Sequence, residues 1–310
     1  MGDSYNIRLY SGFSPSQNFY NFGDALGFNL ITKLSNHTVE LVPFWKANVL
    51  GPGSILFDGG TLFLSPASYS ISGLVRAVRE RLRKIIYPSV KIWGAGFIRP
   101  PERMDGDFSK RFEVCAVRGR RTLEFLERMN IVEDNTTVAL GDPGLLYPML
   151  LEEMPAKEFE IGVVPHYVDK VAGRNLHEKL LAVGIKSVLI DVNGKDSVGV
   201  LSKIASCQTI LSSSLHGCIV SDAMGIPNRL IQLSMISAKP SPSFLDYAFK
   251  FIDYYSAYGI TEIKPMQINE FYEYTKDIVK RISETYIIDA EKVASIKRSL
   301  LASFPFGECD

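Results

Sequence analysis

The sequence lacks the features that mark several classes of protein. No two of its four cysteines have CxxC spacing, and none has a histidine at a zinc-finger distance, which excludes a zinc-finger site. The formal net charge is zero, which argues against a dedicated nucleic-acid-binding domain. No apolar run approaches the roughly 18 residues of a membrane-spanning helix, and the first residues lack a signal-peptide core. We therefore expect a cytoplasmic protein without a nucleic-acid partner.

Several catalytic motifs are also missing. There is no GxGxxG, no GxxxxGK[ST], no HExxH and no GxSxG. Asp105 and Asp107 have DxD spacing, but they lie in a polar turn, which is the commoner use of such residues. We therefore expect no metal and no organic cofactor.

The pattern that is present predicts an α/β fold. A short apolar strand, a glycine-rich turn and a helix recur along the 310 residues, and this plan is typical of parallel sheets covered by helices. The plan restarts after Pro148 to Pro155. We expect two Rossmann-like domains, at residues 1–152 and 153–265, whose parallel sheets face a cleft. Helices in residues 266–310 are expected to pack back on the domains. Ligands of such sheets bind outside the carboxyl ends of the strands.

The stretch SSSLHGCIV, Ser212 to Val220, follows one of these strands. A helix starting near Gly217 or Cys218 offers unpaired N–H groups, and serine hydroxyls can cap it or bind an oxyanion. His216 beside such a site can donate a hydrogen bond or transfer a proton. The alternative is a serine N-cap with a packed histidine.

Four further positions follow strands or begin helices. His166 follows the first strand expected in the second domain, Ile161 to Val164. Arg118 lies between a strand and a helix, where a guanidinium can clamp an anion. Asp24 of NFGD can cap a helix or accept a proton, and Gly59-Gly60 lets a ligand approach the backbone. The alternatives are a loop histidine, a solvated arginine and a simple cap.

One expected helix, residues 72–86, carries a basic face. Such faces are usually solvated. The functional alternative is peripheral contact with the anionic inner face of the membrane. Its basic residues are Arg76, Arg79, Arg83 and Lys84.

Read together, the motifs resemble the polysaccharide pyruvyl transferase family, and most closely its exopolysaccharide ketal-pyruvate transferase branch. The resemblance covers about residues 5 to 255. The matching segments are NFGD with its helix, FDGGTLF (57–63), WGAGF (93–97), VRGRRTLEFL (117–126), GDPGLLYP (141–148) and SSLHGCIVSDAMGIPN (213–228).

The resemblance implies a GT-B-like fold and a transferase reaction. Such enzymes move the enolpyruvyl carbons of phosphoenolpyruvate onto two hydroxyls of a sugar, which gives a cyclic pyruvate ketal and phosphate. The implied partners are phosphoenolpyruvate and a sugar acceptor linked to a lipid or a nucleotide, with a lipid-linked oligosaccharide expected. The first domain is then the acceptor side and the second the donor side.

The resemblance also assigns roles to residues. His216 matches the motif histidine, which implies phosphoenolpyruvate contact and general acid catalysis, and His166 is the second candidate for proton transfer. Arg118 is expected to bind phosphate or carboxylate, and Asp24 to orient or deprotonate the acceptor hydroxyl. The other donor-binding candidates are Ser213, Ser214, Leu215 and Gly217, and the acceptor-binding candidates are Asn21, Gly59 and Gly60.

One position departs from the family pattern. Many members carry arginine two residues before the motif histidine, where this chain has Ser214. The missing anion contact is assigned to Arg118, Lys170 or Arg174, or the donor differs.

Two other functions remain open from the sequence. A GT-B glycosyltransferase using a nucleotide sugar needs an acidic residue that holds a ribose in the second domain, and Asp191 and Asp222 are the candidates. A non-catalytic protein that binds anions or sugars on the same scaffold predicts binding without phosphate release.

Overall fold

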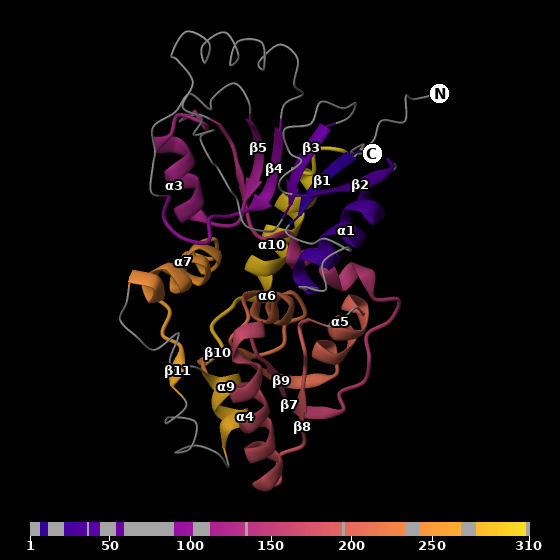
Figure 1. Cartoon of the computed structure of the whole chain (residues 1–310), viewed down its shortest axis with the longest axis vertical. Coiled ribbons are helices and arrows are strands. Elements are labelled where there is room, and N and C mark those ends of the chain that lie inside the picture. Colours follow the sequence, from indigo (N-terminus) through magenta and orange to yellow (C-terminus); the bar gives the residue numbers. More distant parts are fainter. Residues whose placement is uncertain are drawn as a thin grey trace.

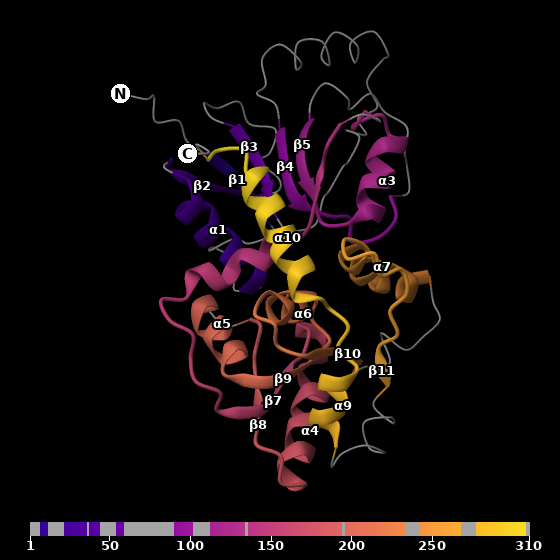
Figure 2. The same cartoon turned by 180° about the vertical axis from the view of Figure 1, so that it is seen from behind.

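In a computed structural model of the chain, two α/β units lie one above the other along the long axis of the molecule (Figures 1 and 2). The structure describes residues 7–11, 22–35, 37–43, 54–58, 90–101, 112–133, 136–193, 196–233, 242–267 and 277–307.

The first unit is built on a parallel sheet with strand order β2-β1-β3-β4-β5-β6. Its strands are β1 (Ile7–Ser11), β2 (Val39–Pro43), β3 (Ser54–Asp58), β4 (Val90–Ala95), β5 (Phe112–Val117) and β6 (Ala139–Leu140), and its helices are α1 (Phe22–Leu34) and α3 (Arg120–Arg128). The 3-10 helix η2 (Pro143–Leu150) leads to the second unit.

The second unit is built on a parallel sheet with order β11-β10-β9-β7-β8. Its strands are β7 (Phe159–Val164), β8 (Ser187–Leu189), β9 (Cys207–Ser212), β10 (Asn228–Gln232) and β11 (Met266–Gln267). The helical segments that follow η2 along the chain are η3 (Tyr167–Asp169), α4 (Lys170–Ala182), α5 (Ser197–Ala205), α6 (Leu215–Ala223), α7 (Pro242–Ser256), α9 (Ile278–Glu284) and α10 (Ala290–Ala302).

Each sheet has a point where the strand order reverses. In the first sheet the chain adds β2 on one side of β1 and β3 on the other, and in the second it adds β8 and β9 on the two sides of β7. The crevice outside the carboxyl ends of two such strands is where ligands of open α/β sheets bind. In the second sheet, this places the loops after β7 and β9 next to each other.

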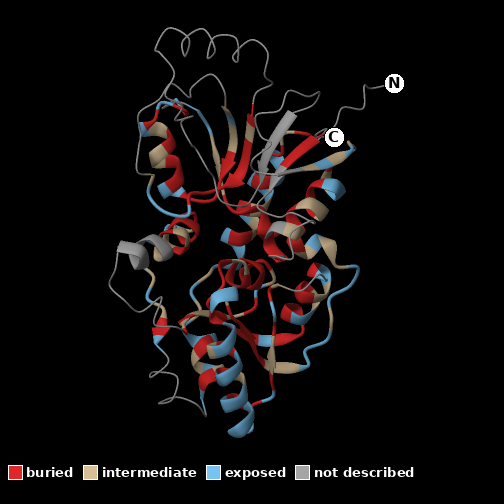
Figure 3. Cartoon of the chain, in the orientation of Figure 1, coloured by how far each residue is buried: buried red, intermediate tan, exposed pale blue. Residues whose placement is uncertain are grey.

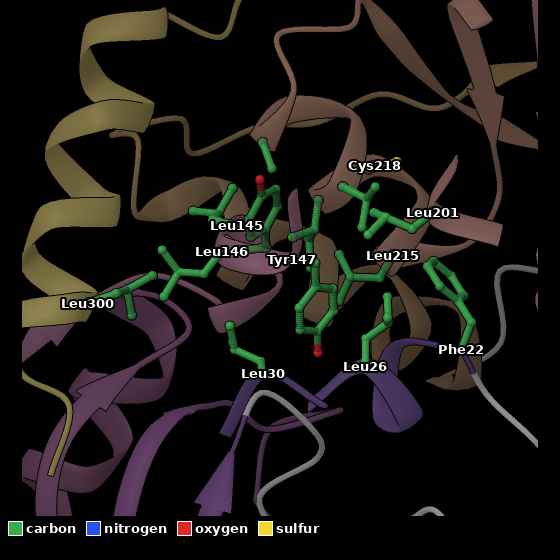
Figure 4. Close-up of a cluster of buried hydrophobic side chains, with 14 of the residues drawn as sticks. Phe22, Leu26, Leu30, Leu145, Leu146, Tyr147, Leu201, Leu215, Cys218 and Leu300 are labelled. Atoms are coloured by element: carbon green, nitrogen blue, oxygen red, sulfur yellow. The ribbon is translucent and has the colours of Figure 1, made fainter. Parts of the chain in front are cut away.

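An apolar core joins the two units. The largest buried cluster contains side chains of both sheets and of the helices between them, and Figure 4 shows Leu26 of α1, Tyr147 of η2 and Leu215 of α6 among them. Figure 3 shows α6 as buried along its length. Each large apolar side chain buried in this way stabilises the fold by about 1.5–3 kcal/mol. The units therefore pack directly on each other through these helices.

Two later helices contact the first unit. The indole Nε1 of Trp93, in β4, donates to the carbonyl oxygen of Leu300 in α10 at 3.0 Å. A Cβ added to Gly141, just after β6, would lie 2.5 Å from a side-chain carbon of Ile296 in α10, which shows how closely this helix packs. Helix α7 packs on α3.

The structure confirms the expected α/β class with parallel sheets and helices. The cleft and the two domain boundaries, at 152/153 and 265/266, stay predictions, and the helix expected at 72–86 lies outside the described residues. Two expectations are wrong or incomplete. Helix α6 begins at Leu215 rather than near Gly217 or Cys218, so His216 belongs to its first turn, and α7 is not predicted from the sequence.

Candidate functional site

His216 lies where the two units meet. Helix α6 begins directly after β9, and no side chain caps it at Ser214. The imidazole of His216 is partly exposed and packs edge-on against Phe22, the first residue of α1, with 6.0 Å between ring centroids. The histidine therefore stands between the N-terminal ends of α6 and α1.

Gly23 fits directly against this histidine. A Cβ added to Gly23 would lie 2.2 Å from Nδ1 of His216, so a larger residue there displaces the ring or the helix. The glycine is held in place, because the hydroxyl of Tyr147 donates to its carbonyl oxygen at 2.8 Å and the amide of Phe22 donates to the carbonyl oxygen of Val192 at 2.9 Å. The structure thus brings together the NFGD and SSSLHG segments.

The serines before α6 stabilise its loop rather than cap the helix. The hydroxyl of Ser212 accepts from the amide of Ser214 at 3.0 Å. The hydroxyl of Ser213 accepts from the amide of His166 at 2.9 Å and donates to Oδ2 of Asp169 at 2.7 Å. The loops after β7 and β9 are therefore hydrogen-bonded to each other, which fixes the position at which His216 emerges.

Two other predicted donor residues pack inside the protein. Leu215 is buried in the core, and a Cβ at Gly217 would lie 2.4 Å from the hydroxyl of Ser212. The space left by the missing side chain of Gly217 is thus occupied by the hydroxyl of Ser212. The donor roles of these residues stay predictions.

The imidazole of His166 is held in its neutral form. Burial, and secondarily the charge of Lys250, lower the pKa of its imidazole to about 4. Its position after β7 is as predicted, and its role in proton transfer stays a prediction.

Arg118 lies in a buried ion pair. Its Nε donates to Oδ2 of Asp253, in α7, at 3.0 Å, and its Nη2 donates to the carbonyl oxygen of Phe97. Asp253 also accepts from the amide of Thr122 at 2.8 Å and from its hydroxyl at 2.7 Å. Arg118 thus binds the carboxylate of Asp253 through one hydrogen bond, and a bidentate clamp on the donor stays a prediction.

The predicted acceptor side is described only in part. Asn21, Gly59 and Gly60 lie outside the described residues, and Asp24 is described as part of α1 without its side chain. Their roles stay predictions.

The remaining charged candidates have partners or lie at the surface. Lys170 pairs with Asp191 at 3.0 Å, with both side chains exposed, and Arg174 is exposed on α4. Asp222 is buried, so it is poorly placed to hold a ribose.

The carboxyl group of Asp222 makes stability depend on pH. Burial raises its pKa to about 7, against hydrogen bonds from Asn228, Tyr254 and Tyr286. The folded state then binds the proton more tightly than the unfolded state. The contribution of this carboxyl group to the free energy of unfolding therefore falls by up to about 4 kcal/mol as pH rises from about 4 to about 7. Above about pH 7 this contribution no longer changes. Urea unfolding across this range should show a shallower slope for Asp222→Asn, and parallel curves would contradict this.

A pocket of about 550 Å³, open mouth included, adjoins the loops after β7 and β9. Ser213 and Asp169 form part of its wall, and Phe251 and Ile252 of α7 another part. Sequence reasoning missed α7, with Asp253 and Lys250, because no motif marks it.

One comparison with known proteins identifies a family. A family model of polysaccharide pyruvyl transferases matches residues 21–234. A protein of Acanthamoeba polyphaga mimivirus, named only as uncharacterized, is 31% identical in a match of 205 residues. The match covers 63% of this chain and 66% of that protein, so the chain spans just under two thirds of its relative's length.

Two solved structures also align with this chain. A Klebsiella pneumoniae protein of uncharacterized function has 12% identity and a TM-score of 0.41, over 81% of this chain and 90% of its own. The wall teichoic acid polymerase TagF has 10% identity and a TM-score of 0.46, over 100% of this chain and 86% of its own. Among the described residues, no helix combines the length and apolar character needed to span a bilayer.

Proposed function

Because the chain belongs to the polysaccharide pyruvyl transferase family, we propose that it moves the enolpyruvyl group of phosphoenolpyruvate onto two hydroxyls of a sugar in a polysaccharide or glycolipid precursor. The structural observation that supports this proposal is the contact between Gly23 and His216. It lies between the segment expected on the acceptor side and the segment expected on the donor side, and a transfer needs its two substrates close together.

The site has the groups that a trianionic donor needs. The first turn of α6 offers backbone N–H groups and the positive end of the helix dipole, which favour a phosphate or carboxylate. His216 stands in that turn and is partly exposed. We assign it as the general acid, because it matches the motif histidine of the family and an imidazole can transfer a proton near neutral pH.

The proposed reaction balances without a further reactant. A proton from His216 adds to the methylene carbon of phosphoenolpyruvate, and the neighbouring carbon is attacked by a sugar hydroxyl. The carbon–oxygen bond to phosphate breaks, and the second hydroxyl closes the ketal ring. Of the two hydroxyl protons, one restores His216 and the other leaves with the phosphate.

The test is phosphate release from phosphoenolpyruvate with lipid-linked and nucleotide-linked saccharides as acceptors. We expect acceptor-dependent release by the wild type and a loss of about 10²–10⁴-fold in His216→Ala, the usual contribution of a general acid. His177→Ala is the matched control, because His177, on α4, is hydrogen-bonded to Ser187 of β8 instead of lying at the start of α6.

Two results would replace the proposal. Release of a nucleoside diphosphate from a nucleotide sugar, without phosphoenolpyruvate, would make the protein a glycosyltransferase. Binding of phosphoenolpyruvate without turnover of any acceptor would make it a binding protein.

A further inference from the structure

Residues beyond the carboxyl ends of three neighbouring strands line the pocket that adjoins the loops after β7 and β9. Asp169 lies in η3, which follows β7, Ser213 follows β9, and Gln232 ends β10. These strands are adjacent in the second sheet, and the crevice outside such strand ends is where open α/β sheets bind ligands. With its open mouth the pocket measures about 550 Å³, within the range of about 300–1,000 Å³ that is usual for small-molecule sites.

Helix α7 forms another part of the wall, and contacts with both units hold it in place. Three of its side chains line the pocket: Ala248, Phe251 and Ile252. Asp253 accepts a hydrogen bond from a backbone amide in the first turn of α3 at 2.8 Å. The hydroxyl of Tyr254 donates to Oδ2 of Asp222 in α6 at 2.9 Å. The helix that carries this part of the wall is therefore fixed from both units.

The carboxyl group of Asp169 is only half used by the fold. The residue is 3% exposed, and its Oδ2 accepts from the hydroxyl of Ser213 at 2.7 Å. Among the described residues, Oδ1 has no hydrogen-bond partner. Asp169 stands at the N-cap of α4, where aspartate usually accepts from a backbone amide, but its side chain makes no such bond. Asp222 differs, because both of its carboxyl oxygens accept hydrogen bonds.

An unpaired acceptor in the wall of a pocket favours a ligand that donates to it. Leaving a buried acceptor without a partner is unfavourable, and such groups in folded proteins are usually paired. A ligand group that donates to Oδ1 of Asp169 supplies the bond that the fold does not. The pocket therefore selects for a hydroxyl or an N–H group.

The rest of the wall restricts the ligand further. Four more apolar residues line the pocket: Leu230, Ile231, Ile263 and Pro265. An anion is disfavoured next to a carboxyl group, and a hydrocarbon chain has no donor for it. A free hexose carries hydroxyls on most of its ring carbons, which an apolar wall leaves unpaired. A nucleoside combines a planar base, which suits the apolar wall, with ribose hydroxyls that can donate.

We propose that this pocket binds a nucleoside, with a ribose hydroxyl donating to Oδ1 of Asp169 and the base against the apolar wall that includes Phe251. The side-chain amide of Gln232 can hydrogen-bond the polar edge of the base. The inference rests on the proposed function and deepens it, because it makes the acceptor a nucleotide-linked sugar held in part by the second unit. His216 stands three residues after Ser213, so the pocket and the proposed general acid share one loop.

The test is calorimetric titration with uridine, cytidine, guanosine and adenosine. We expect the wild type to bind at least one of them saturably, and Asp169→Asn and Ala248→Leu to bind it at least tenfold less tightly. Asparagine can still accept from Ser213, but its amide NH2 cannot accept from a ribose hydroxyl, and leucine at position 248 fills part of the pocket. The 2′-deoxy or the 3′-deoxy nucleoside should lose about tenfold in affinity for the wild type and little for Asp169→Asn.

The matched control is Asp196→Asn. Asp196 is also an N-cap residue of the second unit, but its carboxyl group accepts from the amide of Gly199 at 2.7 Å. This variant should bind the nucleoside as the wild type does.

The outcomes separate this inference from the proposed function. Absence of nucleoside binding, or wild-type affinity in folded Asp169→Asn or Ala248→Leu, would overturn the inference. Phosphate release from phosphoenolpyruvate with a lipid-linked acceptor would then leave the proposed function standing. Nucleoside binding, together with release of a nucleoside diphosphate from a nucleotide sugar and no turnover of phosphoenolpyruvate, would overturn the proposed function and keep the assignment of the pocket.

Discussion

Replacing Asp253 with alanine is expected to lower the free energy of unfolding by about 3–5 kcal/mol, the usual cost of leaving a buried charge without its partner. Both side chains of the Arg118–Asp253 pair are almost fully buried. The variant also removes the acceptor for the amide and hydroxyl of Thr122 at the start of α3. Urea unfolding measures the loss.

The controls separate the ion pair from the general loss of a contact. Ser256→Ala removes no charge but two hydrogen bonds, one from the amide of Arg120 and one to the carbonyl oxygen of Asp253, and should cost only about 1–2 kcal/mol. The double variant Arg118→Met/Asp253→Leu removes both charges and should be more stable than Asp253→Ala. Equal losses in the single and double variants would show that the unpaired charge is not the cause.

Replacing Gly23 with alanine is expected to reduce phosphate release by about 100-fold, the usual effect of moving a catalytic group by about 1 Å. The added Cβ would lie 2.2 Å from Nδ1 of His216, and all three of its nearest atoms belong to that ring. The free energy of unfolding should fall by only about 1–3 kcal/mol, because the ring can rotate away. Steady-state assays and urea unfolding measure the two effects.

A double-mutant cycle shows whether this effect acts through the histidine. In a His216→Ala background the clash is absent, so Gly23→Ala should cause little further loss of activity. A second loss of about 100-fold there would mean that Gly23 matters for another reason, such as the path of α1.

Much of the fold can be predicted because its signals are local. The apolar periodicity predicts a helix over 197–205, and α5 has these bounds. Short apolar runs that end at glycine likewise mark β3 to β5 to within one or two residues. Helix α7 is missed, because no glycine-rich turn or strand motif directly precedes its sequence, PSFLDYAFKFIDYYS.

The site is harder to predict because its contacts join distant segments. Sequence position places Arg118 and His216 after strands, where the structure has them. It does not reveal that Asp253 binds the arginine or that Gly23 contacts the histidine, since neither pair is close in the chain. The start of α6 was misplaced by two or three residues because Gly217 reads as a breaker, whereas here it accommodates the hydroxyl of Ser212.

The contact of α10 with the first sheet bears on the order of synthesis. The described strands of that sheet end at Leu140, but the carbonyl oxygen that receives the Trp93 indole belongs to Leu300. A chain emerging from the ribosome therefore forms the second sheet before it can cover this face of the first. During that interval Trp93 and the surface near Gly141 lack α10, which makes the nascent first unit a candidate for chaperone binding.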